Sequence, residues 1–171
     1  MNIADILLIY EYNYWANEHL LNYCAALTDA QYTAPFDYSV GGVRDTLIHI
    51  LDVELSWRRR MQGDPTDFDL TATDLPTLDA LRERWAAEKM ETFKWLNTLS
   101  DDDLDSMFRF AVDGGMYRER VLWHGLYHVV DHGTQHRSEV AELLSGYGHS
   151  PGDMYFMRFM RESGNVPADS G

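Results

Sequence analysis

The sequence of 171 residues predicts an all-α protein built as a four-helix bundle. Four long stretches repeat apolar residues at intervals of three and four, which is the period of one face of a helix. The connections between them carry proline, glycine and polar residues, which end helices. With 45% hydrophobic and 25% charged residues, the chain has the composition of an ordinary globular protein, so disorder of the whole chain is excluded.

The first two helices are predicted in the N-terminal third of the chain. The first runs from Ile3 to Leu27, with Asn2 as its N-terminal cap. The segment from Thr28 to Ser39 has mixed polarity and is expected to be a connection with a short helical turn. The second helix runs from about Gly42 to Met61, and its apolar residues cover a broad arc. Such an arc indicates a helix that neighbours cover on more than one side.

A loop and a third long helix are predicted next. Residues Gly63 to Pro76 are acidic and contain proline, which is typical of a loop. Thr77 then caps a third helix that continues to about Leu99. Ser100 and Asp103 resemble a capping box, so a short turn is expected after this helix.

A small β-hairpin is predicted before the last long helix. The segments Met107 to Val112 and Met116 to Val121 flank the turn signal Asp113-Gly114-Gly115. Two strands alone are marginally stable, so this hairpin needs packing against the bundle.

The fourth long helix is predicted from about Val121 to Leu144, and a short final helix from Asp153 to Glu162. Gly125 and Gly133 lie toward the inward side of the fourth helix. Glycine lowers helix stability by up to about 1 kcal/mol relative to alanine. We therefore expect these two positions to serve a close approach between helices.

The chain is predicted to form one domain over residues 1–162, followed by a flexible tail over residues 163–171. A net charge of −14 argues against nucleic-acid and anionic-membrane partners. No apolar run approaches the roughly 18 residues of a membrane span. The single cysteine, Cys24, permits no intrachain disulfide, and no signal peptide is evident, so a cytoplasmic location is expected. The many aromatic residues are expected mainly in the core and in a dimer interface.

Histidines carry the strongest chemical signal in the sequence. Four of the seven fall at intervals of four residues on the fourth predicted helix. At about 100° per residue, this spacing forms a slanted stripe. His136 and then His132 lie closest to the buried face, while His128 and His124 turn progressively toward solvent. Because histidines at i and i+4 project together, as in H-x-x-x-H zinc sites, His132 and His136 are the candidate metal-binding pair.

A third ligand has to come from another part of the chain, and His49 on the second predicted helix is the best candidate. It lies at the border between apolar and acidic residues of that helix. Spacing alone leaves open whether His49 meets the pair, and whether the pair binds metal or makes ordinary hydrogen bonds. His19 and His149 are expected to be ordinary surface residues. Three acids close to these histidines could orient their rings or simply be solvated: Asp45, Asp52 and Glu139.

Three segments, taken in order, resemble one known family. They are Tyr14-Trp15-Ala16-Asn17 with the leucines that follow, Ser39 to Gly63 (SVGGVRDTLIHILDVELSWRRRMQG), and Asp131 to Leu144 (DHGTQHRSEVAELL). Together they resemble the DinB/YfiT-like family of bacterial damage-inducible proteins. The resemblance implies a four-helix bundle, commonly a homodimer, with one divalent metal ion held by three histidines.

Carried over residue by residue, the ligands implied by the resemblance are His49, His132 and His136. Imidazole suits Zn, Ni and Fe, so the ligand type does not select the metal. The sequence departs from the family at Ser138-Glu139, where relatives often have Gly-Gln. This departure does not touch the ligands, but it places an acid about one turn along the helix from His136.

The resemblance also implies a class of chemistry. Relatives resemble thiol S-transferases and thiol-dependent isomerases that use low-molecular-weight bacterial thiols. We therefore expect a small-molecule substrate, with such a thiol as a reactant, at a metal whose three protein ligands leave coordination positions open. The alternatives are a metal-dependent hydrolase, a non-catalytic metal-binding stress-response protein, and a dimeric bundle whose histidines bind no metal. Tyr10, Tyr14 and Trp57 could line a pocket, although they suit a core equally well.

Overall fold

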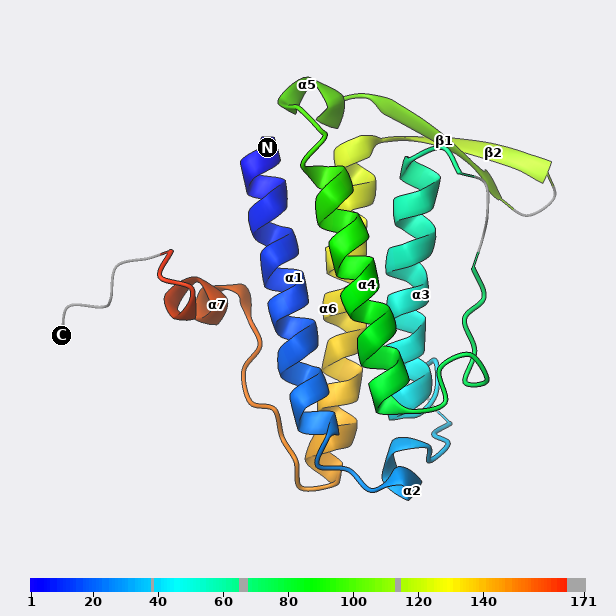
Figure 1. Ribbon diagram of the computed structural model, residues 1–171, viewed down its shortest axis with the longest axis vertical. Coiled ribbons are helices and arrows are strands. Elements are labelled where there is room, and N and C mark those ends of the chain that lie inside the picture. Colours follow the sequence, from blue (N-terminus) through cyan, green and yellow to red (C-terminus); the bar gives the residue numbers. More distant parts are fainter. Residues whose placement is uncertain (38, 65–67, 113–114, 166–171) are drawn as a thin grey trace.

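The structure is a computed structural model that describes residues 1–37, 39–64, 68–112 and 115–165. It is mostly helical and confirms the predicted fold class, including the hairpin before the last long helix and the short C-terminal helix (Figure 1). Four long helices form the bundle: α1 (Ile3–Cys24), α3 (Val43–Met61), α4 (Leu78–Leu96) and α6 (Leu122–Gly146). The smaller elements are α2 (Asp29–Tyr32), α5 (Asp101–Leu104), β1 (Met107–Val112), β2 (Met116–Val121) and α7 (Phe156–Glu162).

The predicted caps set where the helices begin. The Asn2 side chain accepts a hydrogen bond from the Asp5 backbone N–H, and Asp5 accepts one from Asn2 in return, both at 2.9 Å. Thr77 caps α4 by accepting from Ala80 at 3.2 Å. Gly42 caps α3 without a side chain because a Cβ there would lie 2.0 Å from the carbonyl oxygen of Ala34.

Three predicted helix ends shift by a few residues. The first and third helices end at Cys24 and Leu96, three residues before the predicted ends. Beyond both ends the hydrogen bonds switch to the tighter spacing of three residues, as in Leu27 to Cys24 and Leu99 to Leu96. The final helix begins at Phe156 instead of Asp153, because residues 151–155 form no regular structure and the backbone of Tyr155 is extended.

The core lies between the four long helices, where α6 packs against both α3 and α1, and α4 closes the bundle against the same two helices. It includes fully buried leucines and isoleucines from every long helix: Ile6, Leu20, Leu47, Leu51, Leu81, Leu96, Leu126 and Leu144. Cys24, at the end of α1, is 2% exposed, and burial raises its pKa to about 12. Among the described residues, no helix combines the length and apolar character that a membrane crossing requires.

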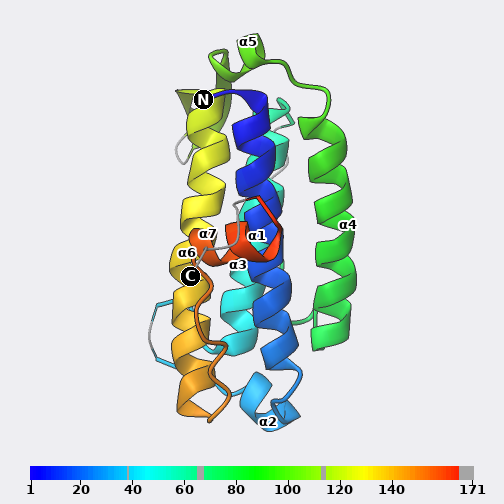
Figure 2. The same ribbon diagram turned by 90° about the vertical axis from the view of Figure 1, so that its left-hand side faces the viewer.

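Aromatic residues tie the C-terminal segment to the bundle. Helix α7 lies against α1 (Figure 2), where Tyr12 packs on Phe156 and Phe159 at ring separations of 5.4 and 6.0 Å. The Tyr12 hydroxyl also donates to the carbonyl oxygen of Met154 at 3.0 Å. His19 lies half-buried on the Trp15 ring, with its Nε2 2.8 Å from the Pro151 carbonyl oxygen, so it is a packing residue rather than the surface residue predicted. The predicted tail over residues 163–171 lies mostly outside the described residues, which end at 165.

The hairpin pairs antiparallel, from Met107 opposite Val121 to Val112 opposite Met116, and it extends from one end of the bundle (Figure 1). Its root is anchored because Phe108 is buried and packs edge-on against Trp57 at 6.2 Å. The first two residues of its predicted turn, 113 and 114, lie outside the described residues.

Both inward glycines of α6 serve close packing, as predicted. A Cβ at Gly125 would lie 2.8 Å from Met61 Sδ and 3.0 Å from Phe108 Cζ. A Cβ at Gly133 would lie 2.8 Å from Arg137 Nη1 and 3.1 Å from Asn13 Oδ1. Gly125 therefore leaves room for α3 and the hairpin, and Gly133 leaves room for a buried polar network.

Gly125→Ala should lower the free energy of unfolding by about 1–2 kcal/mol. Crowding of a packed core costs about 1–3 kcal/mol, and the better helix propensity of alanine offsets at most about 1 kcal/mol. Urea denaturation would measure the change. Gly146→Ala on the same helix is the matched control, because a Cβ there meets nothing within 4 Å and should leave stability unchanged or slightly higher. Equal stability of the two variants would contradict the packing role of Gly125.

Candidate metal centre

Three histidines from two helices meet between α3 and α6. His49 comes from α3, and His132 and His136 come from consecutive turns of α6. One nitrogen of each ring lies within 4.8 Å of the other two, so the three residues could hold a metal ion. The ring centroids are 4.4 to 5.0 Å apart. The structure thus brings together all three predicted ligand residues, although His49 and His132 are 83 positions apart in the chain.

The shortest contact of the cluster fits a shared ion. His49 Nε2 lies 3.1 Å from His132 Nε2. Two nitrogens bound tetrahedrally to one ion at about 2.0–2.1 Å lie about 3.3 Å apart. A hydrogen bond between the two rings has a similar length, but it uses only two of the three nitrogens that converge here. The third ring, that of His136, approaches His49 edge-on with a centroid separation of 4.8 Å.

Two imidazoles of the cluster, those of His49 and His132, are held in the neutral form, which is the form that binds metal. Burial, followed by the neighbouring rings of His136, His49 and His128, lowers the pKa of His132 to about 3. Burial and the His136 ring also lower the pKa of His49. Within the described part of the chain, His132 Nδ1 is buried without a hydrogen-bond partner. A buried polar atom left in this way is uncommon in folded proteins, so the His132 ring has a binding capacity that the described protein atoms do not meet.

A carboxylate fixes the orientation of His136. Glu139 Oε2 lies 2.8 Å from His136 Nδ1 and accepts a hydrogen bond from Ser39 Oγ at 2.9 Å. Burial acts to raise the pKa of Glu139, but the hydrogen bonds from His136 and Ser39 outweigh it and hold that pKa below its usual value. The ionised carboxylate can only accept, so His136 Nδ1 carries a proton, and Nε2 is the ring nitrogen left to coordinate an ion. Of the three acids considered in the sequence, Glu139 is thus the one seen to orient a ring.

The other two acids belong to a pocket that opens beside His49. This pocket has a volume of about 320 Å³, and its lining includes His49, Val40, Asp45 and Asp52. Asp52 accepts a hydrogen bond from the Leu70 backbone N–H at 2.9 Å and so holds the following loop against α3. Asp45 pairs with the neighbouring Arg44 at 3.0 Å. A small molecule in this pocket would lie directly against one ring of the cluster.

The four histidines of the stripe on α6 are buried in the order that the helical geometry predicts. His136 is 6% exposed, His132 is half-buried, and His128 and His124 are exposed, which confirms the predicted order. His128 packs on Trp57 at a ring separation of 4.7 Å, one turn from His132. Of the two roles considered for Tyr10, the structure supports the core, because the side chain is buried and donates to the Leu126 carbonyl oxygen at 3.2 Å.

A buried polar network, which the apolar pattern did not predict, begins at the residue after His136. Arg137 is 2% exposed, and its Nη1 donates to the Oδ1 atoms of Asn13 and Asn17 at 2.6 and 2.8 Å. The Nδ2 atoms of both asparagines then donate to Glu54 Oε1 at 2.8 and 3.0 Å. Trp85 Nε1 donates to Glu54 Oε2 at 2.8 Å. The two asparagines therefore connect a buried arginine with a buried glutamate across α1, α3 and α6.

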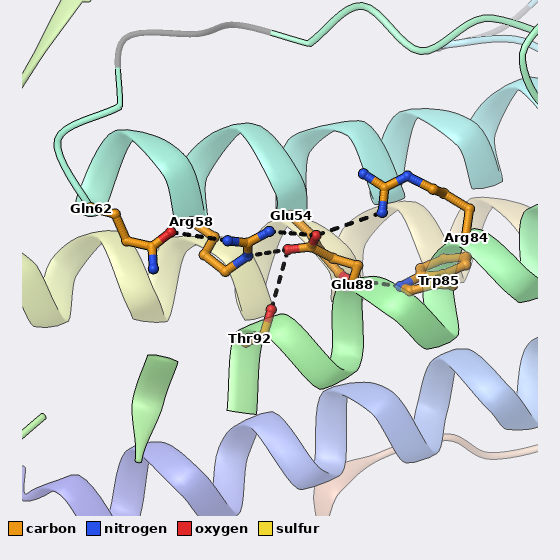
Figure 3. A network of polar contacts seen from close by, with 7 residues as sticks. All are labelled: Glu54, Arg58, Gln62, Arg84, Trp85, Glu88 and Thr92. Atoms are coloured by element: carbon orange, nitrogen blue, oxygen red, sulfur yellow. Dashed lines mark hydrogen bonds and ion pairs between the residues drawn. The ribbon is translucent and has the colours of Figure 1, made fainter. Parts of the chain in front are cut away.

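A second polar network joins α3 to α4 beside the first (Figure 3). Glu88 is fully buried and forms a two-point ion pair with Arg58, of which the Nη2–Oε2 contact measures 2.8 Å. Thr92 Oγ1 also donates to Glu88 at 3.3 Å, and Arg84 lies 3.9 Å from it.

One signal for the first network is visible in the sequence: Asn13 and Asn17 are spaced by four on the apolar side of α1. Together the two networks fix the relative positions of the helices that carry the histidines.

Comparison with known proteins identifies relatives over the same region. The DinB family model matches residues 1–165, a span that contains all three clustered histidines. Two proteins of Bacillus subtilis (strain 168) are similar over most of their length. The one named Protein DinB is 25% identical over 168 residues, covering 91% of this chain and 94% of that protein. The one named Uncharacterized protein YizA is 28% identical over 132 residues, covering 74% of this chain and 80% of that protein.

Proposed function

Because this chain belongs to the DinB family and brings three histidines together, we propose that it binds one divalent metal ion through His49, His132 and His136. We further propose that the loaded protein is an enzyme that joins a low-molecular-weight thiol to a small electrophile, as in S-transfer or thiol-dependent isomerisation. The native ion on this proposal is Zn, Ni or Fe, which all accept neutral imidazole.

The observation that carries the proposal is the convergence of three imidazoles, one of which, His49, lines an open pocket. Structural zinc sites are closed by four protein ligands, whereas catalytic sites keep a position free for a reactant. Here the described residues offer three ligands, and the pocket of about 320 Å³ reaches His49. When bound, a divalent ion would lower the pKa of a coordinated thiol or water. The deprotonated ligand is then available as a nucleophile at neutral pH.

The residues of the chain have separate tasks in this proposal. His49 and His132 stay uncharged because burial and the neighbouring rings lower the pKa of both side chains. Glu139 keeps the His136 proton on Nδ1, away from the other two rings. The pocket beside His49, with a volume of about 320 Å³, has room for small reactants.

The test uses protein purified without an affinity tag. Metal analysis should find about one divalent ion for each chain, and an activated carbon electrophile should be consumed only when a low-molecular-weight thiol is added. Removal of the ion with a chelator should abolish this turnover, and its return should restore it. Turnover that needs metal but no thiol would indicate a hydrolase instead. Bound metal with no turnover of any electrophile–thiol pair in a broad panel would indicate a non-catalytic metal-binding protein.

A further inference from the structure

A chain of two hydrogen bonds runs from the loop before α3 to the metal centre. Ser39 Oγ donates to Glu139 Oε2 at 2.9 Å, and the same carboxylate oxygen lies 2.8 Å from His136 Nδ1. The three residues come from different parts of the fold, because Ser39 precedes α3 while the other two lie on α6. The contact between Glu139 and His136 is therefore part of a hydrogen-bonded chain that links α6 to the loop before α3, and not an isolated pair on one helix.

Burial distinguishes this pair from an ordinary solvated pair on a helix. The side chains of His136 and Glu139 are 8% and 18% exposed. By contrast, the pair of Lys94 and Glu91 on α4 has the same spacing with side chains 77% and 56% exposed, and its atoms are 3.9 Å apart. A short contact at low exposure holds both side chains in one geometry, whereas an exposed pair of this spacing contributes little.

The backbone conformation of Ser39 independently supports a specific role for its hydrogen bond to Glu139. Its φ angle is +52°, and among the described residues it is the only non-glycine with a positive φ. A residue other than glycine is held in the left-handed region only where its surroundings over-determine it. The hydrogen bond from Ser39 to Glu139 is such a constraint, because it requires the hydroxyl to face α6.

We propose that Glu139 is a positioning residue for the metal centre and that Ser39 positions Glu139; this inference rests on the proposed function. Glu139 keeps His136 in the tautomer and ring orientation in which Nε2 faces His49 and His132. Ser39 connects this orientation to the loop before α3. The neighbour of Ser39, Val40, lines the pocket beside His49, so the same loop contributes to both the ligand geometry and the pocket wall.

A consequence follows from thermodynamic linkage. If the arrangement of Ser39 and Glu139 strengthens metal binding, then bound metal strengthens that arrangement by the same factor. Backbone amide exchange at residues 39–41 should therefore slow when the ion binds. Loss of the Ser39 hydroxyl should reduce this protection.

The experiment compares four variants of the full chain with the wild type, using Zn²⁺ alone as the probe. Glu139→Met removes the acceptor but keeps the side-chain length, and Glu139→Gln keeps an acceptor without the charge. Ser39→Ala removes the hydroxyl. Glu142→Met is the matched control, because it removes the same charge one turn further along α6 at an exposed position. Affinity is measured by competition with a chromophoric chelator, and circular dichroism of the metal-free variants checks their folding.

Loss of an outer partner of a metal-binding histidine typically weakens metal affinity 10–100-fold, so Glu139→Met should fall in about that range. Glu139→Gln should recover most of the loss, Ser39→Ala should show a smaller loss than Glu139→Met, and Glu142→Met should match the wild type. In metal-free wild type, nitrogen-15 NMR should find the His136 proton on Nδ1. In Glu139→Met it should find a mixture of tautomers. This NMR readout does not depend on activity.

The outcomes separate the two proposals. Wild-type protein that binds no Zn²⁺ would overturn the proposed function. Wild type that binds Zn²⁺, together with a Glu139→Met variant that binds it equally well, would leave the function standing and overturn the positioning role. Equal losses in Glu139→Met and Glu142→Met would also overturn that role, because the effect would then be one of net charge.

Discussion

Replacing Arg137 with methionine should lower the free energy of unfolding by about 3–5 kcal/mol, the cost of removing one partner from a buried charge pair. The variant leaves the Oδ1 atoms of Asn13 and Asn17 without their donor. It also removes the positive charge nearest to Glu54 in the network. Burial already raises the pKa of Glu54, against the hydrogen bonds it accepts and the charge of Arg137. Urea denaturation in the presence of a chelator would measure the loss without a contribution from bound metal.

A double-mutant cycle identifies the network as the cause. Glu54→Met alone should also destabilise the protein, because it leaves Arg137 charged in the core. The double variant should cost less than the sum of the single variants by at least about 1 kcal/mol, since no unpaired charge remains. Additive losses would show that Arg137 and Glu54 do not interact through the asparagines.

Replacing His136 with alanine should weaken metal affinity by more than about a hundredfold, because a ligand contributes more than the outer partners whose loss costs about 10–100-fold. Thiol-dependent turnover should disappear in the same variant. Binding of the ion to the wild type should also raise its melting temperature, because a ligand that binds only the folded state stabilises it. This shift should be absent in His136→Ala. Competition with a chelator and thermal melts with and without Zn²⁺ measure the two effects.

His124→Ala is the matched control for this experiment. His124 lies on the same helix and on the same stripe, but it is exposed and packs against Trp123 at a ring separation of 4.1 Å. The His124→Ala variant should bind Zn²⁺ as tightly as the wild type does. Full metal content in His136→Ala, or an equal loss in His124→Ala, would contradict the three-histidine site.

The sequence allowed the site to be predicted in part because helical geometry is regular. Four histidines at a constant spacing drift steadily around α6, so their order of burial follows from the angle per residue. The choice of His132 and His136 over His124 and His128 needed no knowledge of the partner helix. The meeting with His49 did need it, since periodicity identifies the inward face of α3 but not the helix that it faces. Resemblance to a family supplied that step.

The polar networks could not be predicted by the same reasoning. Hydrophobic periodicity assigns apolar residues to the core and leaves polar ones to solvent, whereas Asn13, Glu54 and Arg137 are all buried. Their burial depends on hydrogen bonds between α1, α3 and α6, which are long-range contacts. The helix ends shifted for a similar reason, because the last turns tightened into three-residue hydrogen bonds that leave no trace in the apolar pattern.

The burial of Cys24 has a consequence for the proposed reaction with electrophiles. Alkylating agents modify thiolates, and a thiol whose pKa is about 12 is almost entirely protonated at neutral pH. The only cysteine of the chain is therefore shielded twice, by its surroundings and by its protonation state. On the proposed function, the thiol that attacks the electrophile must therefore come from solution, because the chain supplies no reactive thiol of its own.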